Sequence, residues 1–303
     1  MIARILLGMD FSASAFSALR YGGLLARFFK AELHVLHVVE PDGLARVHPD
    51  LLNQVSSDPL LASIKPGSGD RKVEVSYTSG EGESARLTVY QVERKAESPA
   101  SGILSFAGEI NPDLVLLGTH GRRGLDRFFL GSVAERVVYD SPYPVITLRA
   151  GTGAAQRFPI RRVLVPIDFS EASTRQVAYA ARMASFLKDA TLDLFHVIED
   201  VKLPAAYGVA PITLAVPEVF ARTKAALKDL VHANGESDVP FEPHVTSGKP
   251  HEKVLDFAAH QETDLILLAP HTPPGYRQCL LGRVSERILR LSPCPVLSLP
   301  THS

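Results

Sequence analysis

The chain has 303 residues, of which 46% are hydrophobic and 21% charged, and its formal net charge is -1. This length is enough for two domains of ordinary size. The balanced charge gives no electrostatic reason to expect nucleic acid or a membrane surface as a partner. No apolar run approaches the roughly 18 residues of a membrane-spanning helix. Cys279 and Cys294, the two cysteines, lack the CxxC spacing of a metal or redox site, so we expect a cytoplasmic protein with no protein-bound metal.

The first half alternates short apolar runs with stretches of helical periodicity. The runs are too short for helices and too continuously apolar for half-exposed strands, which is typical of parallel strands buried on both faces. These predicted strands are 5–7, 33–36, 114–117 and 145–148, and the predicted helices between them include 12–29 and 133–139. The pattern predicts an α/β fold with a doubly wound, Rossmann-like parallel sheet, in which ligands bind at the carboxyl ends of the strands.

One segment of the first half departs from this alternation. Residues 73–94 alternate apolar and polar side chains on both sides of Gly80-Glu81-Gly82, which predicts a β-hairpin. The preceding residues, 41–70, are rich in proline, glycine and serine and show little helical period. We therefore expect no second helix of ordinary length there, whereas 217–233 supplies one in the second half.

The second half repeats the first in the same order. RILLGMDFS (4–12) pairs with RVLVPIDFS (162–170), and DLVLLGTHG (113–121) pairs with DLILLAPHT (264–272). GSVAERVVYDSPYPVITL (131–148) likewise pairs with GRVSERILRLSPCPVLSL (282–299). Such a repeat indicates a duplicated domain. We place the domains at 1–150 and 158–303, and the small residues of 149–159 predict an exposed linker.

A glycine-rich loop, GTHGRRGLDRFFLGS (118–132), follows the predicted strand 114–117. We expect a turn through Gly118 and Gly121, then a helix with Ser132 as N-cap and Glu135 completing a capping box. The N-terminus of a helix attracts anions such as phosphate. Nearby arginines add positive charge, although surface arginines are more often solvated than ligands. From the residues alone, an anion site and a flexible connection to a capped helix remain equal alternatives.

The spacing Gly118-x-x-Gly121, nine residues, then Gly131-Ser132 resembles the nucleotide motif of ATP-binding universal stress proteins. The DFS and SPxPV segments and the histidine-valine pairs of both halves also match, so the chain resembles a tandem member. The resemblance implies two adenine-nucleotide α-hydrolase-like domains, of which the first carries the residues that bind ATP, with any Mg²⁺ carried by the phosphates. It places Asp10 near adenosine and Val38 against adenine. Around the ribose and phosphates it places Gly118, His120, Gly121, Gly131, Ser132 and Val133.

Two of these positions have simpler interpretations. Asp10 follows the first strand, where it could cap the next helix without any ligand. His37 is expected to be a strand-end histidine with no special role.

The second half lacks several residues of the nucleotide motif. Ala269 and Thr272 replace Gly118 and Gly121, and Arg283 replaces Ser132, which would remove an N-cap worth about 1 kcal/mol. Pro270, Pro273 and Pro274 lack the backbone donors that a phosphate cradle uses. We expect that the second half does not bind ATP in the manner of the family.

Three functions remain open. The preferred one is an ATP-binding regulatory stress-response protein with ATP in the first half. The alternatives are a slow ATPase or nucleotidyl-transfer enzyme and a nucleotide-free scaffold. The chain has no P-loop, HExxH or GxSxG motif, so we assign no catalytic residue and expect at most slow ATP hydrolysis.

The resemblance also suggests how the halves assemble. The predicted terminal strands, 144–148 and 295–299, would be sheet edges that need cover. In the family these strands pair between subunits. We expect the two halves to be related by a pseudo-twofold axis, either in a pseudo-dimeric monomer or in a chain that forms a further homodimer.

Replacing Gly121 by valine tests whether the glycine-rich loop 118–132 holds phosphates with its backbone amides. The Gly121→Val side chain would occupy the space through which phosphates approach the backbone, so ATP binding should be lost while the fold is retained. Titration calorimetry with ATP and a circular dichroism spectrum measure the two effects, and unchanged affinity would contradict the cradle.

Overall fold

The computed structural model describes ten stretches of the chain: 2–40, 58–65, 67, 69–78, 84–119, 130–187, 189–199, 217–234, 239–270 and 282–301. They form two compact units. The first comprises Met1–Gln156 and Leu297–Ser303, and the second comprises Arg157–Val296. Each unit has an α/β fold with a mostly parallel sheet, which confirms the predicted fold class. The pseudo-twofold relation between the halves stays a prediction.

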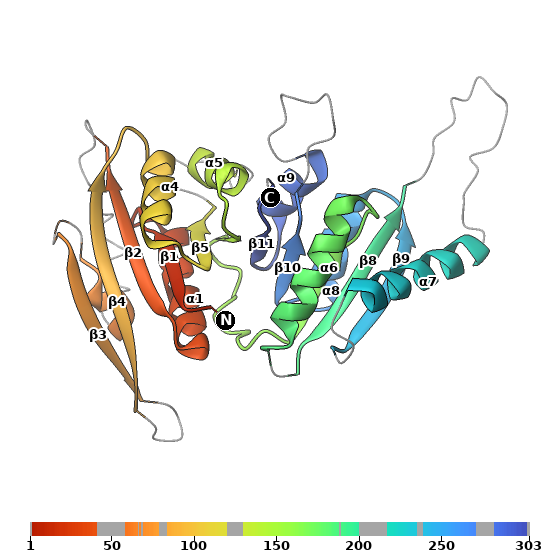
Figure 1. The fold of residues 1–303 in the computed structure, drawn as a ribbon, viewed down its shortest axis with the longest axis horizontal. Coiled ribbons are helices and arrows are strands. Elements are labelled where there is room, and N and C mark those ends of the chain that lie inside the picture. Colours follow the sequence, from red (N-terminus) through yellow and green to blue (C-terminus); the bar gives the residue numbers. More distant parts are fainter. Residues whose placement is uncertain are drawn as a thin grey trace. The chain divides into compact units, whose positions relative to one another are not determined.

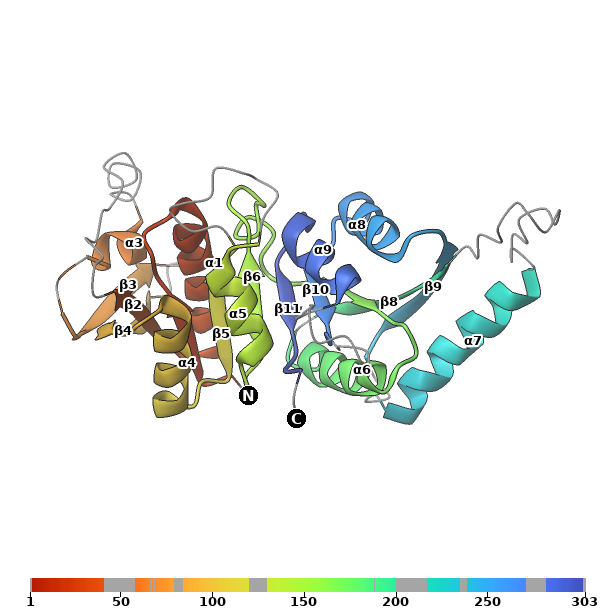
Figure 2. The same cartoon turned by 90° about the horizontal axis from the view of Figure 1, so that it is seen from above.

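The first unit is a sheet covered by helices on both faces. Its strand order is β3-β4-β2-β1-β5-β6, and every neighbouring pair is parallel except β3 and β4. Helices α1 and α3 contact each other on one face, and α4 and α5 contact each other on the other (Figures 1 and 2). The strands are β1 (Arg4–Gly8), β2 (Glu32–Val39), β3 (Arg71–Thr78), β4 (Ser84–Lys95), β5 (Leu114–Gly118) and β6 (Val145–Leu148). The helices are α1 (Ala13–Phe29), α3 (Pro59–Ser63), α4 (Pro99–Ile110) and α5 (Ser132–Asp140).

The core of this unit comes from the apolar runs of its central strands. Leu6, Leu33 and Leu116 are fully buried, as expected for parallel strands covered on both faces. The first-half strands predicted at 5–7, 33–36, 114–117 and 145–148 are therefore confirmed.

The predicted hairpin is also confirmed. Strands β3 and β4 pair antiparallel, and β4 also pairs with β2, so the hairpin extends the sheet at its edge. The turn at 79–83 lies outside the described residues. Gln91 of β4 is 3% exposed, and its side-chain oxygen accepts from the Lys65 amide at 3.1 Å and from Arg71 Nε at 3.1 Å. This amide therefore fastens the chain that follows α3 to the hairpin.

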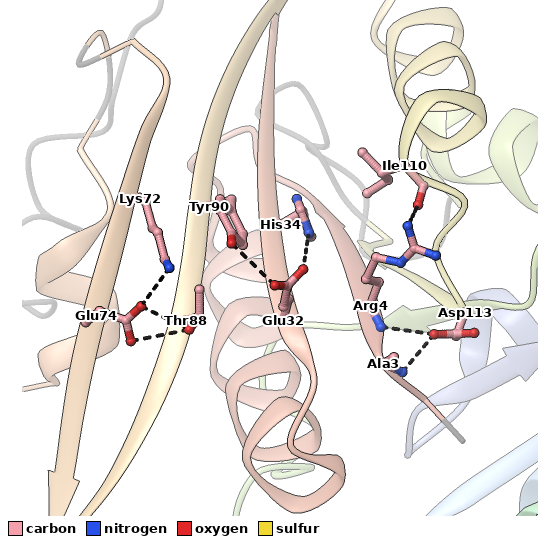
Figure 3. A network of polar contacts seen from close by, with 10 residues as sticks. All are labelled: Ala3, Arg4, Glu32, His34, Lys72, Glu74, Thr88, Tyr90, Ile110 and Asp113. Atoms are coloured by element: carbon pink, nitrogen blue, oxygen red, sulfur yellow. Dashed lines mark hydrogen bonds and ion pairs between the residues drawn. The ribbon is translucent and has the colours of Figure 1, made fainter.

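Polar contacts fix the amino ends of the strands (Figure 3). The Asp113 carboxylate accepts from the backbone amides of Ala3 at 2.7 Å and Arg4 at 3.0 Å, which joins the start of β1 to the start of β5. Glu32 accepts from the Tyr90 hydroxyl at 3.3 Å and lies 3.5 Å from His34 Nε2. Burial lowers the pKa of His34 although Glu32 acts in the opposite direction. These contacts occupy the edge opposite the one where a ligand is expected.

The second unit has the same architecture without the hairpin. Its strands pair in the order β10-β7-β8-β9, all parallel. Helices α6 and α7 contact each other on one face and α8 and α9 on the other (Figure 2). The strands are β7 (Arg162–Pro166), β8 (Thr191–Ile198), β9 (Phe241–Ser247) and β10 (Leu265–Leu268). Strand β11 (Val296–Ser298) begins at the last residue of this unit, and its other residues are counted with the first unit. The helices are α6 (Glu171–Ala184), α7 (Pro217–Asn234), α8 (Pro250–His260) and α9 (Arg283–Leu291), and α7 confirms the helix predicted at 217–233.

The linker is not wholly exposed, contrary to the prediction. Ala154 is 8% exposed, and the chain around it forms turns. A small side chain at this position is therefore packed inside the protein.

A buried carboxylate on β8 has no counterpart among the sequence predictions. Asp193 is fully buried, and Arg162 donates to both of its oxygens, from Nε at 3.0 Å and from Nη2 at 2.9 Å. His244 Nε2 lies 2.9 Å from Oδ1. Burial by itself would raise the pKa of Asp193, but hydrogen bonds from His244 and Arg162 outweigh it and hold that pKa below its usual value. The charge of Asp193 is thus balanced inside the second unit.

Removing the guanidinium should destabilise the second unit. Arg162→Met leaves a buried carboxylate with only His244, so the unit should lose about 3 kcal/mol of unfolding free energy. Hydrogen exchange of the β8 amides measures the loss, and Arg161→Met, an exposed neighbour, should change it by less than about 0.5 kcal/mol. Because the folded pKa is depressed, the stabilisation exists above the unfolded pKa of about 3.9. The difference between wild type and Arg162→Met should shrink as the pH falls below about 4, and a constant difference would contradict the role of charge.

Candidate functional site

The carboxyl end of β1 leads directly into the first turn of α1. The Asp10 Oδ1 atom accepts from the Ser12 amide at 2.9 Å, and the Ser12 hydroxyl accepts from the Ala15 amide at 3.2 Å. Phe11 between them has a left-handed φ of 61°. Ser12 is therefore the N-cap of α1. Asp10 accepts a hydrogen bond in the turn before α1 and does not cap the helix. The alternative in which Asp10 is the cap of the helix is therefore wrong.

His37 has a structural contact at the same edge. Its Nδ1 atom lies 2.7 Å from the Met9 carbonyl oxygen, and its ring packs against Phe11 with the centroids 5.0 Å apart. The equivalent His196 of the second unit contacts the Ile167 carbonyl oxygen at 2.8 Å. In both units this histidine joins the ends of two neighbouring strands.

Gly118 is required by close packing. It is the last residue of β5 and pairs with Leu148, so the turn predicted through it is wrong. A Cβ atom at this position would lie 2.5 Å from the Ser14 Oγ atom and 2.7 Å from the Ser14 carbonyl carbon. The missing side chain allows the end of β5 to touch the first turn of α1.

The start of α5 lies beside the end of β5. The Gly131 amide donates to the Thr119 carbonyl at 2.7 Å, and the Thr119 amide donates to the Leu148 carbonyl at 2.8 Å. Gly131 is the N-cap, with φ −62° and ψ 139°, and no side chain caps the helix. The predicted capping box is therefore wrong: Ser132 is the first helical residue rather than the cap.

These contacts bring several of the predicted site residues to one edge. Asp10 is linked through Ser12 and Ser14 to Gly118, and Gly118 continues through Thr119 to Gly131. Ser132 and Val133 follow in the first turn of α5. The first-turn amides of an α-helix have no carbonyl partner within the helix, so this turn presents donors at the edge. His120 and Gly121 lie outside the described residues, as do the loop arginines Arg122, Arg123 and Arg127.

Val38, which the resemblance places against adenine, packs against α4. It is 9% exposed, and a Cβ atom on Gly102 would lie 2.8 Å and 2.9 Å from its two methyl groups. Val38 therefore packs under α4, and little of its side chain is accessible to a base.

The second unit builds this edge differently. Asp168 again accepts from a turn amide, that of Ser170 at 3.0 Å, but it also accepts from the Ser173 hydroxyl at 2.8 Å. Gln176 donates to the carbonyls of Pro166 at 3.0 Å and Leu267 at 2.6 Å, which joins β7 to β10. Serine and glutamine side chains thus occupy this edge with bonds inside the unit.

The first residue of α9 is Arg283, and its N-cap is Gly282 with φ 70°. Neither unit uses the residue after the last glycine of the motif as a cap. The prediction that Arg283 removes a cap is therefore wrong. The first residue of the helix differs between the units in charge and size, since it is serine in α5 and arginine in α9. Thr272, Pro273 and Pro274 lie outside the described residues.

Within the described residues, one group has the spacing of metal ligands. One atom each of Asp193, Glu242 and His244 lies within 4.8 Å of the others. Arg162 already donates to both carboxylate oxygens of Asp193 and balances its charge. We therefore interpret the group as a structural ion network.

The comparisons with known proteins agree with this architecture. The model of the Universal stress protein family matches residues 1–149 and again residues 159–300. The chain belongs to the universal stress protein family. A universal stress protein of Mycolicibacterium smegmatis is 25% identical over 303 residues, covering 97% of this chain and 95% of the relative.

A solved universal stress protein shares the fold. The crystal structure of one from Archaeoglobus fulgidus covers 98% of each chain, with 20% identity and a TM-score of 0.59. The match to a crystal structure of another universal stress protein, in complex with cAMP, covers 47% of this chain and 98% of that one, with 21% identity and a TM-score of 0.35.

Among the described helices of this universal stress protein, none has the length and apolar character of a membrane span.

Two glycines allow a matched test of the packing at the site. Gly118→Ala forces a methyl group against Ser14, so the first unit should lose about 1–3 kcal/mol of unfolding free energy. Gly108→Ala, in α4, adds a methyl group with no neighbouring atom within 4 Å and should gain up to about 1 kcal/mol from helix propensity. Urea unfolding measures both changes, and a neutral Gly118→Ala would show that the contact is not tight.

Proposed function

We propose that this universal stress protein is an ATP-binding regulatory protein of the cytoplasm that holds ATP in its first domain. The first domain is taken as 1–150 and the second as 158–303. In this proposal the bound nucleotide sets the conformation or the choice of protein partner. The observation that carries it is the first turn of α5, which has no side-chain cap and lies at the carboxyl edge of the sheet.

The donors of this turn suit a phosphate group. The Gly131 amide is engaged by Thr119, so the phosphate would be held by the amides of Ser132 and Val133 and by the Ser132 hydroxyl. The partial positive charge of a helix N-terminus adds to these hydrogen bonds. Gly131 keeps side-chain bulk away from the approach. His120 and Gly121 are included from the family motif.

The neighbouring edge suits the ribose. The Asp10 carboxylate is oriented by its bond to the Ser12 amide, and a carboxylate accepts hydrogen bonds from hydroxyl groups. Because Val38 is packed under Gly102, its contact with adenine rests on the resemblance alone. A Mg²⁺ ion would be held by the phosphates and water, since Mg²⁺ commonly keeps several waters and binds substrate phosphates.

The second domain is proposed not to bind ATP in this manner. Arg283 stands where the first domain has Ser132, so the hydroxyl acceptor and donor is absent there. The Asp168 carboxylate accepts a hydrogen bond from Ser173 inside the domain. We propose at most slow ATP hydrolysis, and association into a homodimer remains part of the proposal.

Proline at the first helical position removes one amide while preserving a helix. Ser132→Pro deletes the hydroxyl and the amide donor, so ATP affinity should fall by at least about tenfold, because each hydrogen bond to a charged group contributes about 1.5–3 kcal/mol. Ser132→Ala deletes the hydroxyl alone and should have a smaller effect. Titration calorimetry with ATP measures both.

Arg283→Pro makes the same change at the first position of α9 and is the matched control. It should leave ATP affinity unchanged.

The nucleotide released from denatured protein should be near one ATP per chain. A value near two would show that the second domain binds, rapid turnover of added ATP would favour the enzyme alternative, and failure to bind added ATP would favour the scaffold.

A further inference from the structure

A pocket of the first domain lies away from the proposed nucleotide edge. It has a volume of about 260 Å³ and is formed by α1, the start of α3, strand β3 and Ala155 of the linker. Its wall includes Arg20, Leu24, Arg27, Asp58, Leu60 and Tyr77. Along α1, at 1.5 Å per residue, Arg20 lies roughly 9 Å and Arg27 roughly 20 Å from Ser14 at the ATP edge. The pocket is therefore distinct from the proposed nucleotide site.

The pocket has an excess of positive charge. The Arg27 guanidinium lies 4.3 Å from the centre of the Tyr77 ring, and among the described residues it has no carboxylate at ion-pair distance. Arg20 Nε lies 3.7 Å from Asp58 Oδ2. The other oxygen of Asp58 accepts from the amides of Leu60 at 3.0 Å and Leu61 at 3.4 Å and so caps α3. The pocket thus has two cations and one carboxylate, and that carboxylate lies at ion-pair distance from Arg20 alone.

The remaining groups define the type of anion. Burial, together with the charge of Asp58, raises the pKa of Tyr77 to about 12, so its hydroxyl remains protonated and able to donate at neutral pH. Leu24 and Leu60 provide apolar wall, and Leu60 is 2% exposed. A volume of about 260 Å³ equals that of roughly nine water molecules in the liquid. This is enough for a ring or a short chain carrying one charged group.

We propose that this pocket binds a small organic carboxylate, with its charge on Arg20 and Arg27 and its apolar part against Leu24 and Leu60. Guanidinium groups match the geometry of a carboxylate, which accepts two parallel hydrogen bonds from one arginine. The two arginines and Asp58 leave one net positive charge, which balances a monoanion. A phosphate dianion has no apolar part that could contact Leu24 and Leu60. The wall depends on Tyr77 of β3, and the described part of the second domain has no counterpart of that strand.

Benzoate is a suitable probe, and benzamide is its neutral analogue of the same shape. Titration calorimetry of the full chain should detect benzoate binding, with benzamide at least about tenfold weaker. Arg27→Gln should weaken benzoate at least about tenfold, and Tyr77→Phe, which keeps the ring under Arg27, should weaken it several-fold. The ATP affinity of both variants should equal that of the wild type, because the two sites are separate.

Arg182→Gln is the matched control, because Arg182 also lies over a tyrosine ring, 5.5 Å from the centre of Tyr179, but in the second domain. It should leave benzoate affinity unchanged. Benzoate binding that survives Arg27→Gln, equal binding of benzamide, or no binding at millimolar benzoate would each overturn the proposal. Tighter binding of inorganic phosphate at the same residues would overturn the assignment to a carboxylate.

Discussion

The contact between the end of β5 and the first turn of α1 sets the geometry of the first domain's ligand edge. Gly118 leaves no room for a side chain, because a Cβ atom would lie within 3 Å of both the side chain and the backbone of Ser14. The next residue, Thr119, then accepts from the Gly131 amide, which positions the start of α5. A displacement of β5 from α1 would therefore move the first turn of α5 relative to Asp10. The proposed phosphate and ribose contacts both depend on that separation.

The two domains use the same backbone frame with different side chains. Phe11 and Phe169 share a left-handed φ of 61° and each packs against a strand-end histidine. Phe11 is 2% exposed, and the ring of Phe16 packs beside it. Phe169 is 43% exposed, because the position equivalent to Phe16 holds the exposed Thr174, which has no ring to cover it. The edge of the second domain is instead joined by the hydrogen bonds of Ser173 and Gln176. Duplication thus preserved the strand-to-helix turn while the surrounding contacts changed.

Sequence patterns predict what depends on local periodicity. The buried strands, the hairpin and the helix at 217–233 follow from runs of apolar residues, because the period of such a run differs between strand and helix. The predicted cap of α5 is wrong by one residue, since Ser132 and Gly131 are both acceptable caps and only the backbone angles distinguish them. The packing role of Gly118 has no local signal, because Ser14 lies far away in the chain. Asp193 has none for the same reason: its partners, Arg162 and His244, come from two other strands.

The two proposed sites of the first domain share α1: the nucleotide edge uses its first turn, and the pocket uses its residues from Arg20 to Arg27. The nucleotide edge depends on the contact of Ser14 with β5, and the carboxylate pocket depends on Arg27 in the last turn, where a positive charge is favoured by the helix dipole. A regular helix fixes the distance between these ends, but coupling between two ligands requires an element with two alternative arrangements. Within the described residues α1 is a continuous helix from Ala13 to Phe29. ATP and a carboxylate should therefore bind independently, and any coupling between them would have to arise from movement of the hairpin or α5 against α1.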